Sequence, residues 1–261
     1  MDNAVVIIGS GLAGYAVARE LRKLDSSIPI TMISADHGGF YSKPMLSNAL
    51  STGKTPESIL NGDAVQMAAQ LKIAIRPHCR VVAINQAQNT LTLVDGEEIF
   101  YDQLVFALGA DQIRLPLQGD GVAKVLTVND LDDYHNFRDV IKDKKRISII
   151  GAGLIGCEFA NDLVTAGYQV DVIDISAQPL GRLLPSAGGV FLQQKLEAAG
   201  VIFHLDTATQ SINQIDEHLH LILTNGDSIE SDIVLSAVGL RPRTQLAEAA
   251  GIQINREIGR A

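Results

Sequence analysis

Near its start the chain reads Val5-Val6-Ile7-Ile8-Gly9-Ser10-Gly11-Leu12-Ala13-Gly14, an apolar run that continues without a break into closely spaced glycines. The same order returns at Ile147-Ser148-Ile149-Ile150-Gly151-Ala152-Gly153-Leu154-Ile155-Gly156. Gly-x-Gly-x-x-Gly between a strand and a helix is the fingerprint of a dinucleotide-binding fold. One copy is weak evidence, because glycine-rich turns are common. Two copies in the same setting predict two nucleotide sites and suggest electron transfer between two bound cofactors.

Each glycine of the fingerprint has a physical task. The first permits a tight turn, the second lets the backbone approach a pyrophosphate, and the third lets the helix pack on the strand. The helix N-terminus then offers free N–H groups to the phosphates. We therefore expect cofactor contacts from Gly9, Ser10, Gly11, Leu12, Ala13 and Gly14 in the first copy, and from Gly151, Gly153, Leu154, Ile155 and Gly156 in the second. We also expect the next residues, Tyr15 and Cys157, to point along the nucleotide.

An acidic residue at the end of the second strand usually accepts the ribose hydroxyl. In the second copy this residue is Asp174, and Ile175-Ser176-Ala177-Gln178 after it contains no Lys or Arg to hold a ribose phosphate. The second site should therefore prefer NADH to NADPH. In the first copy the corresponding residue is Ser34, with Asp36 two residues further on, and we expect Ser34 and Ala35 to contact the cofactor. Ser34 can still donate to ribose or phosphate, although the usual carboxylate is absent from its position.

Beyond the fingerprints the two halves continue to resemble each other. Each helical pattern returns to a short apolar strand (30–33 and 170–173), which predicts βαβ units and parallel sheets. Hairpin turns follow at Asp95-Gly96 and Asn225-Gly226. Each hairpin leads into a strand that ends in glycine, at Gly109 and Gly239. The sequence predicts an α/β fold of two Rossmann-type three-layer nucleotide-binding domains, each with a small β-meander.

The first half carries an additional polar loop around residues 41–54. Extra loops beside nucleotide sites are often functional. Lys43 in this loop is either a cationic partner of a cofactor or an ordinary surface lysine. Glu158, expected in the first turn of the second helix, either favours the helix N-terminus or faces the reacting rings.

Composition limits the functional classes. The chain has 261 residues, 46% hydrophobic and 20% charged, which is typical of a globular protein with a sizeable core. A net charge of −9 argues against nucleic acid as a partner. Two cysteines without a Cys-x-x-Cys pair make a disulfide framework or a metal site implausible. Without a signal peptide or an apolar run of membrane-spanning length, we expect a cytoplasmic protein with no membrane insertion.

Three segments carry a family resemblance: GAGLIGCEFAND (151–162), YSKPMLS (41–47) and LSAVGLRP (235–242). They resemble the pyridine nucleotide-disulfide reductase superfamily and, within it, the bacterial rubredoxin–NAD(+) reductases. The resemblance implies FAD at the first fingerprint, NADH at the second and an NAD domain inserted into the FAD domain. The implied boundaries are 1–112, 113–238 and 239–261. It also implies that Lys43 touches the flavin, that Glu158 lies near the flavin–nicotinamide contact, and that Val81 contacts the adenine end of FAD.

The chain departs from relatives of this kind in three places. Asn48 replaces a lysine that often pairs with the glutamate, so a Lys43–Glu158 pair is a hypothesis. The sequence stops at Gly259-Arg260-Ala261 without the usual Gly-Asp motif, so we expect it to be the front part of a longer protein. The reductases' Cys-x-x-x-x-Cys is also missing, so electrons would leave the flavin directly.

The implied function is an FAD-dependent NADH:rubredoxin oxidoreductase, in which electrons pass singly to rubredoxin for alkane degradation or for oxygen and peroxide detoxification. A reductase for the ferredoxin partner of an oxygenase and a flavin- or NAD-binding redox sensor remain alternatives.

Overall fold

The computed structural model describes residues 4–255, which divide into two compact units. The first unit contains residues 4–43, 57–111 and 241–255; the second contains 44–56 and 112–240. The chain crosses between the units at four points, two of which lie in the paired strands β10 (Ala110–Gln112) and β18 (Leu240–Pro242). The predicted boundaries at 112 and 238 stay a prediction, and positions 256–261 of the last predicted segment lie outside the described residues.

The first unit is built on a parallel sheet of order β5-β2-β1-β9. Because successive side chains of a strand point to opposite faces, β1 serves two cores at once. Val5 and Ile7 pack with the helices, whereas Val6 and Ile8 pack with the β6-β7-β8 meander. The elements of this unit are β1 (Val5–Ile8), α1 (Leu12–Leu24), β2 (Ile30–Ile33), β3 (Phe40–Tyr41), β4 (Leu60–Gly62), α3 (Ala64–Leu71), β5 (Ala74–Arg76), β6 (Val81–Asn85), β7 (Thr90–Leu93), β8 (Glu98–Phe100), β9 (Gln103–Phe106) and α7 (Gln245–Ala249).

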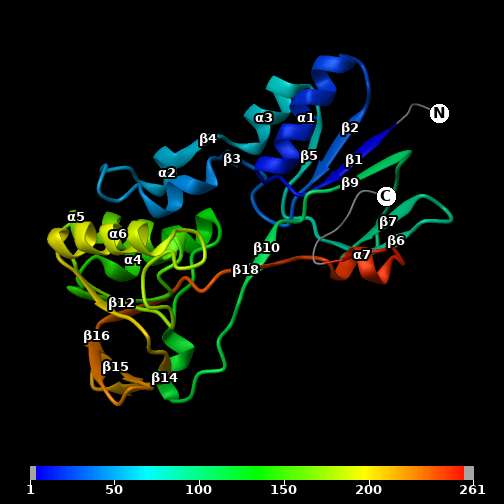
Figure 1. Ribbon diagram of the computed structural model, residues 1–261. Coiled ribbons are helices and arrows are strands. Elements are labelled where there is room, and N and C mark those ends of the chain that lie inside the picture. Colours follow the sequence, from blue (N-terminus) through cyan, green and yellow to red (C-terminus); the bar gives the residue numbers. More distant parts are fainter. Residues whose placement is uncertain (1–3, 256–261) are drawn as a thin grey trace. The chain divides into compact units, whose positions relative to one another are not determined.

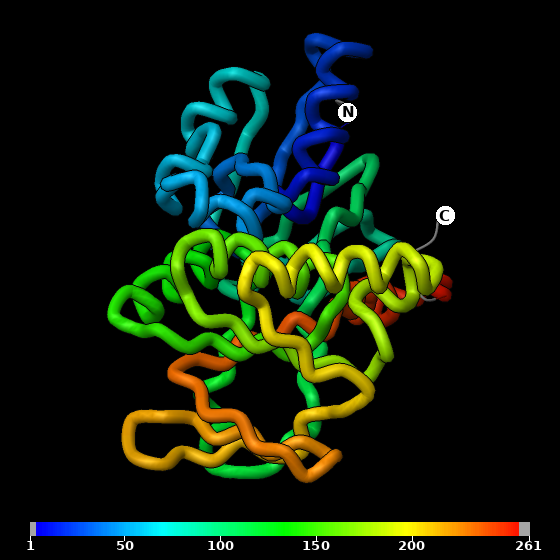
Figure 2. Tube along the Cα trace, turned by 60° about the vertical axis from the view of Figure 1, so that its left-hand side comes forward, coloured from blue at the N-terminus to red at the C-terminus, as the bar shows by residue number. Residues whose placement is uncertain are grey.

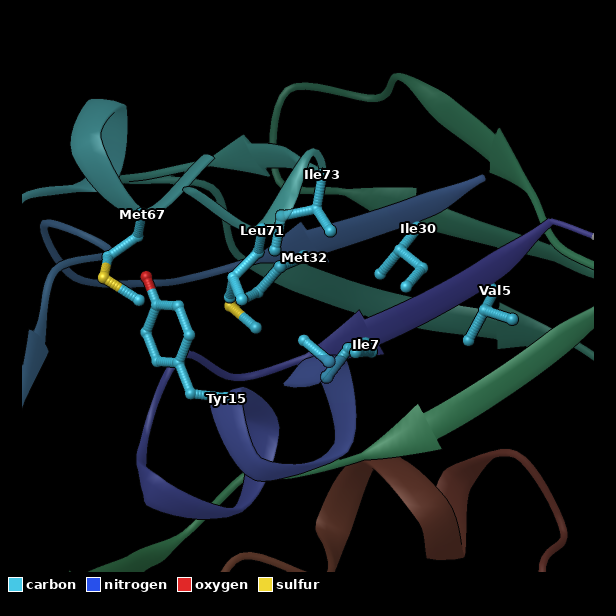
Figure 3. Close-up of a cluster of buried hydrophobic side chains, with 9 residues drawn as sticks. Val5, Ile7, Tyr15, Ile30, Met32, Met67, Leu71 and Ile73 are labelled. Atoms are coloured by element: carbon cyan, nitrogen blue, oxygen red, sulfur yellow. The ribbon is translucent and has the colours of Figure 1, made fainter. Parts of the chain in front are cut away.

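Tyr15 lies at the centre of the helix-side core. Figure 3 shows its ring extending from α1 toward Met67 of α3, beside Met32 of β2. Its hydroxyl donates a hydrogen bond to the Gly38 carbonyl, and burial raises its pKa to about 12. The expectation that Tyr15 points along the nucleotide is therefore wrong: the residue after the third glycine faces the sheet.

The second unit repeats this plan with a sheet of order β13-β12-β11-β17. Figure 1 and Figure 2 show α5 and α6 on one side of this sheet and the antiparallel strands β14, β15 and β16 on the other. Its elements are η2 (Asp120–Lys124), α4 (Leu131–Ile141), β11 (Arg146–Ile150), α5 (Leu154–Thr165), β12 (Gln169–Ile173), α6 (Ser186–Ala199), β13 (Val201–His204), β14 (Thr209–Ile215), β15 (His218–Leu223), β16 (Ser228–Ser231) and β17 (Ile233–Ser236).

The predicted fold class is confirmed. In the first unit β1 lies between β2 and β9, and in the second unit β11 lies in the same way between β12 and β17. Both predicted hairpin turns place glycine at positive φ, 89° for Gly96 and 92° for Gly226. Between positions 4 and 255, none of the helices is both long enough and apolar enough to cross a membrane.

Residues 44–56, called the inserted loop below, belong to the second unit, and a short element begins at each of its two ends. These are η1 (Lys43–Ser47) and α2 (Pro56–Ile59). The segment around residues 41–54 was expected to be a polar loop, but Leu46 and Ser47 of η1 and the following Ala49 are buried. The first part of the inserted loop packs in the second unit through these buried side chains, whereas residues 51–55 are exposed.

Candidate functional site

The first and third glycines of each fingerprint are in backbone contact. A Cβ atom added to Gly14 would lie 2.0 Å from the Gly9 carbonyl oxygen, and one added to Gly156 would lie 1.9 Å from that of Gly151. Real Cβ atoms do not approach an oxygen so closely. Gly9 and Gly151 also have φ of 114° and 110°, which L side chains rarely adopt. These four positions require glycine for the fold itself, whether or not a ligand binds.

The middle glycines are different, because they border open space. Apart from the glycine itself and its neighbours along the chain, no heavy atom of residues 4–255 lies within 4 Å of the Cβ position of Gly11 or Gly153. The two residues after each middle glycine are exposed, including Leu12 at 45% and Leu154 at 53%. Each fingerprint therefore forms a cradle that the described chain leaves open.

The helix N-termini at these cradles are available to an anion. Gly11 and Gly153 are the N-caps of α1 and α5, and within the described residues no side chain caps either of them. Neither first turn contains an acidic residue in the described structure. Unpaired backbone N–H groups and the positive end of the helix dipole thus face the cradle. Both cradles fit a pyrophosphate on these observations.

In the first copy a carboxylate joins the end of β2 to the glycine turn through hydroxyl groups. Asp36 accepts hydrogen bonds from Ser34 Oγ, from Ser10 Oγ at 3.0 Å and from the Gly38 N–H at 2.9 Å. Burial alone would raise the pKa of Asp36, but these three hydrogen bonds outweigh it and lower the pKa below its ordinary value. Asp36 is therefore held as a carboxylate beside the cradle, two positions after the predicted Ser34.

In the second copy the carboxylate makes the same connection through backbone groups. Asp174 accepts hydrogen bonds from the Ala152 N–H at 2.6 Å and from the Ser176 N–H at 2.7 Å. Ala152 follows the first glycine, as Ser10 does in the other copy. Comparing Ser34-Ala35-Asp36 with Asp174-Ile175-Ser176 shows that acid and hydroxyl have exchanged places. The two cradles therefore share a backbone and differ in the groups beside the expected ribose.

Three of the remaining predicted cofactor residues follow the C-terminal ends of parallel strands. Gly109 and Gly239 follow β9 and β17 with φ of 70° and 112°, and Ala35 is exposed after β2. Val81, by contrast, is 9% exposed and packs in the meander-side core of the first unit. Its expected contact with FAD stays a prediction.

Glu158 is the fifth residue of α5, so the prediction that it lies in the first turn is wrong. Its carboxylate accepts a hydrogen bond from Ser47 Oγ of the inserted loop. Lys43 is the first residue of η1 and belongs to the other unit. The hypothesis of a Lys43–Glu158 pair stays a prediction, and the partner that the structure gives Glu158 is Ser47.

One buried acidic residue of α5 was not singled out from the sequence. Asp162, one helical turn beyond Glu158, is 2% exposed and receives hydrogen bonds from Leu50 and Ser51. A signal was present in the sequence, because Asp162 interrupts the apolar face formed by Phe159 and Leu163. A charge on a buried helical face requires partners.

Cys157 is buried, and its thiol donates to the Ala152 carbonyl oxygen at 3.4 Å. It therefore does not point along a nucleotide, contrary to expectation. Burial, together with the neighbouring carboxylates of Asp174 and Glu158, raises its pKa to about 11. A nucleophilic role requires a thiolate, so Cys157 is a structural residue.

Two open cradles on two Rossmann-type units define a protein of the dinucleotide-binding class. The model of the family described as pyridine nucleotide-disulphide oxidoreductase matches residues 3–260. The chain belongs to this family.

Similar proteins include two rubredoxin-NAD(+) reductases. That of Acinetobacter baylyi is 47% identical and that of Alcanivorax borkumensis 43% identical, each over 97% of this chain. The chain spans 66% of the length of each of these relatives. Among solved structures, a ferredoxin reductase from Rhodopseudomonas palustris matches with a TM-score of 0.91 and 28% identity, over 98% of this chain and 63% of that one.

The contact between the glycines predicts a difference between two alanine variants. Gly156→Ala should destabilise the second unit by about 1–3 kcal/mol or more, because its Cβ meets a backbone oxygen. Gly153→Ala, at a φ of −72° and in open space, should cost less than about 1 kcal/mol. It should nevertheless weaken nucleotide binding, since its methyl group enters the cradle. Thermal unfolding and NADH titration measure both effects. Equal stability of the two variants would contradict the packing described above.

The raised pKa of Cys157 predicts slow alkylation. With a pKa of about 11, roughly one thiol in a thousand is ionised at pH 8. Iodoacetamide should therefore modify the Cys157 peptide about 100-fold more slowly than in the guanidinium-unfolded protein, as followed by mass spectrometry. The rate should continue to rise with pH above 9. A plateau at or below pH 9 would show that the thiol is not desolvated.

Proposed function

We propose that the first cradle binds FAD, that the second binds NADH, and that the whole protein is an FAD-dependent NADH:rubredoxin oxidoreductase. The duplicated open cradle carries this proposal, because two dinucleotides are what such a chain can hold. Membership in the oxidoreductase family supports the two cofactors. The names of the relatives at 47% and 43% identity support rubredoxin as acceptor.

The groups beside the second cradle favour NADH. The Asp174 carboxylate is fixed by two backbone N–H groups, so its charge stays at the end of β12. A ribose hydroxyl can donate to a carboxylate, whereas a ribose phosphate is repelled by it. Exposed Ile175, next in sequence, offers no cation to offset that repulsion.

The groups beside the first cradle suit a cofactor that stays bound. Asp36, Ser10 and Ser34 form one hydrogen-bonded cluster at the end of β2. A preformed polar cluster holds a ligand without further ordering of side chains. Ser34 and Ala35 remain proposed FAD contacts, as do Val81 and Lys43.

FAD, when bound, accepts a hydride from NADH and can release electrons one at a time. The part played by the chain is to bind and orient the two dinucleotides. The absence of a Cys-x-x-x-x-Cys pair from the sequence supports direct transfer from FAD to an iron protein. A role in alkane degradation and a cytoplasmic location remain parts of the proposal.

A ferredoxin-type acceptor is the second candidate. The observation that favours it is the match to the Rhodopseudomonas palustris ferredoxin reductase at a TM-score of 0.91. Both candidates are small iron proteins, and they differ in their iron centre: a single iron in rubredoxin or an iron–sulfur cluster in ferredoxin.

Reconstitution of the full-length protein tests the proposal. It should bind FAD, oxidise NADH and reduce rubredoxin faster than a [2Fe–2S] ferredoxin, as followed by the absorbance of each iron protein. Faster reduction of ferredoxin would favour the second candidate. Absence of flavin binding, or of NADH oxidation in the presence of FAD, would refute both.

The charge of Asp174 predicts a change of nucleotide preference. Replacing Asp174 by Asn and Ile175 by Arg removes a carboxylate and adds a guanidinium, so the ratio of NADPH to NADH affinity should rise by at least about tenfold, or about 1.4 kcal/mol. Asp171→Asn is the matched control, because Asp171 lies on β12, three residues before Asp174, but pairs with His204. Equilibrium titration with both nucleotides measures the ratio. An unchanged ratio in the double variant would remove Asp174 from the ribose site.

A further inference from the structure

Asp162 is a buried carboxylate whose hydrogen-bond donors all lie in one short segment of the chain. Its Oδ2 accepts from the Leu50 N–H at 3.0 Å, and its Oδ1 accepts from the Ser51 N–H at 2.8 Å and from Ser51 Oγ at 2.5 Å. All three donors belong to the inserted loop, residues 44–56, which lies in the same unit as α5. A carboxylate at 2% exposure is costly unless it is fully hydrogen-bonded, so its presence on α5 calls for an explanation.

The loop is also hydrogen-bonded to its unit before and after the two residues, Leu50 and Ser51, that bind Asp162. Before them, Ser47 Oγ donates to Glu158, one turn earlier on α5. After them, Arg138 of α4 donates to the Lys54 carbonyl oxygen at 2.8 Å and to the hydroxyl of buried Tyr134 at 2.9 Å. Of the loop's attachments at Glu158, Asp162 and Arg138 in the described part of the chain, the one at Asp162 is the most buried and has the most hydrogen bonds.

The loop also has order of its own. The Lys54 N–H donates to the Ala49 carbonyl oxygen, and the Gly53 N–H donates to that of Leu50, which closes a compact turn. Asp162 holds the start of this turn by two successive backbone N–H groups. The chain leaves the first unit after Lys43, passes through this hydrogen-bonded loop and returns to the first unit at Glu57.

We infer that Asp162 is a positioning residue, which fixes the inserted loop to helix α5 and thereby orients η1, the segment that begins at Lys43. The same helix carries the second cradle at its N-terminus and, through Asp162, the loop that adjoins the proposed flavin contact. This role rests on the proposed function for its effect on hydride transfer, but the attachment of the loop does not depend on any cofactor.

Amide hydrogen exchange on the full-length protein without cofactors tests the attachment. Asp162→Ala should accelerate exchange at the Leu50 and Ser51 amides by about tenfold or more, because both lose their acceptor. Ser51→Ala removes only the hydroxyl bond and should leave the Leu50 amide protected. Asn161→Ala, at an exposed position of the same helix, is the matched control and should change neither amide. Unchanged exchange in Asp162→Ala would overturn the inference.

Flavin measurements on the reconstituted full-length protein test the positioning role. Asp162→Ala should slow single-turnover reduction of the flavin by NADH by at least about tenfold, because small displacements of reacting groups reduce rates steeply. The dissociation constant for NADH and the flavin content should stay within about twofold of wild type, while the visible circular dichroism of the flavin should change. Asp162→Asn keeps one acceptor oxygen and should recover part of the rate.

The outcomes separate the two proposals. If wild type binds no flavin, the proposed function fails, whereas the exchange result still decides whether Asp162 holds the loop. If flavin binds and the Leu50 and Ser51 amides lose protection, but the reduction rate and the flavin spectrum match those of wild type, Asp162 is structural and the positioning role is wrong.

Discussion

Both units depend on the tight backbone contact between the first and third glycines of each fingerprint. With 2.0 Å or less between a hypothetical Cβ and a carbonyl oxygen, no other residue fits at Gly14 or Gly156 without moving backbone. This contact places each helix directly on the strand before it and aims the helix N-terminus past the turn. The open cradle at the middle glycine is then a by-product of packing, which a dinucleotide can use. The same atoms therefore serve stability and binding, and the parallel sheets are arranged around them.

The carboxylate beside each cradle shows how one backbone design supports two different sites. Asp36 is bonded to the turn through the hydroxyl of Ser10, and Asp174 through the backbone N–H of Ala152. Both carboxylates fasten the end of the second strand to the glycine turn, and both also have a neighbour two residues away that donates to them. They differ in the position of the negative charge: Asp174 directly follows β12, whereas Asp36 lies three residues after the end of β2. This difference is a physical basis on which the two cradles can select different nucleotides.

Much of the fold could be predicted from the sequence because its signals are local. Glycine spacing, the apolar runs and the turns at Gly96 and Gly226 each depend on a few neighbouring residues, and the structure has the predicted elements. The site was less predictable, because its side chains meet across long sequence separations. Ser47 and Glu158 are 111 residues apart, and no local pattern pairs them. Tyr15 and Cys157 were assigned to the nucleotide since they follow a glycine, but both side chains are buried, Tyr15 in the helix-side core and Cys157 against the Ala152 carbonyl.

The two copies differ most in what their fingerprint helices carry beyond the cradle. Counting from the third glycine, Glu158 and Asp162 of α5 correspond to Ala16 and Glu20 of α1. Ala16 is exposed, and Glu20 pairs with Lys23 at 2.6 Å on the surface, where an ion pair contributes little. On α5 the same two positions instead hold a loop that comes from the other half of the chain, with Asp162 buried to do so. Nucleotide binding by itself does not require a buried charge at the position of Asp162, since Glu20 at the corresponding position of α1 is exposed. The acids of α5 are best understood as the means by which the second copy fastens a segment of the first.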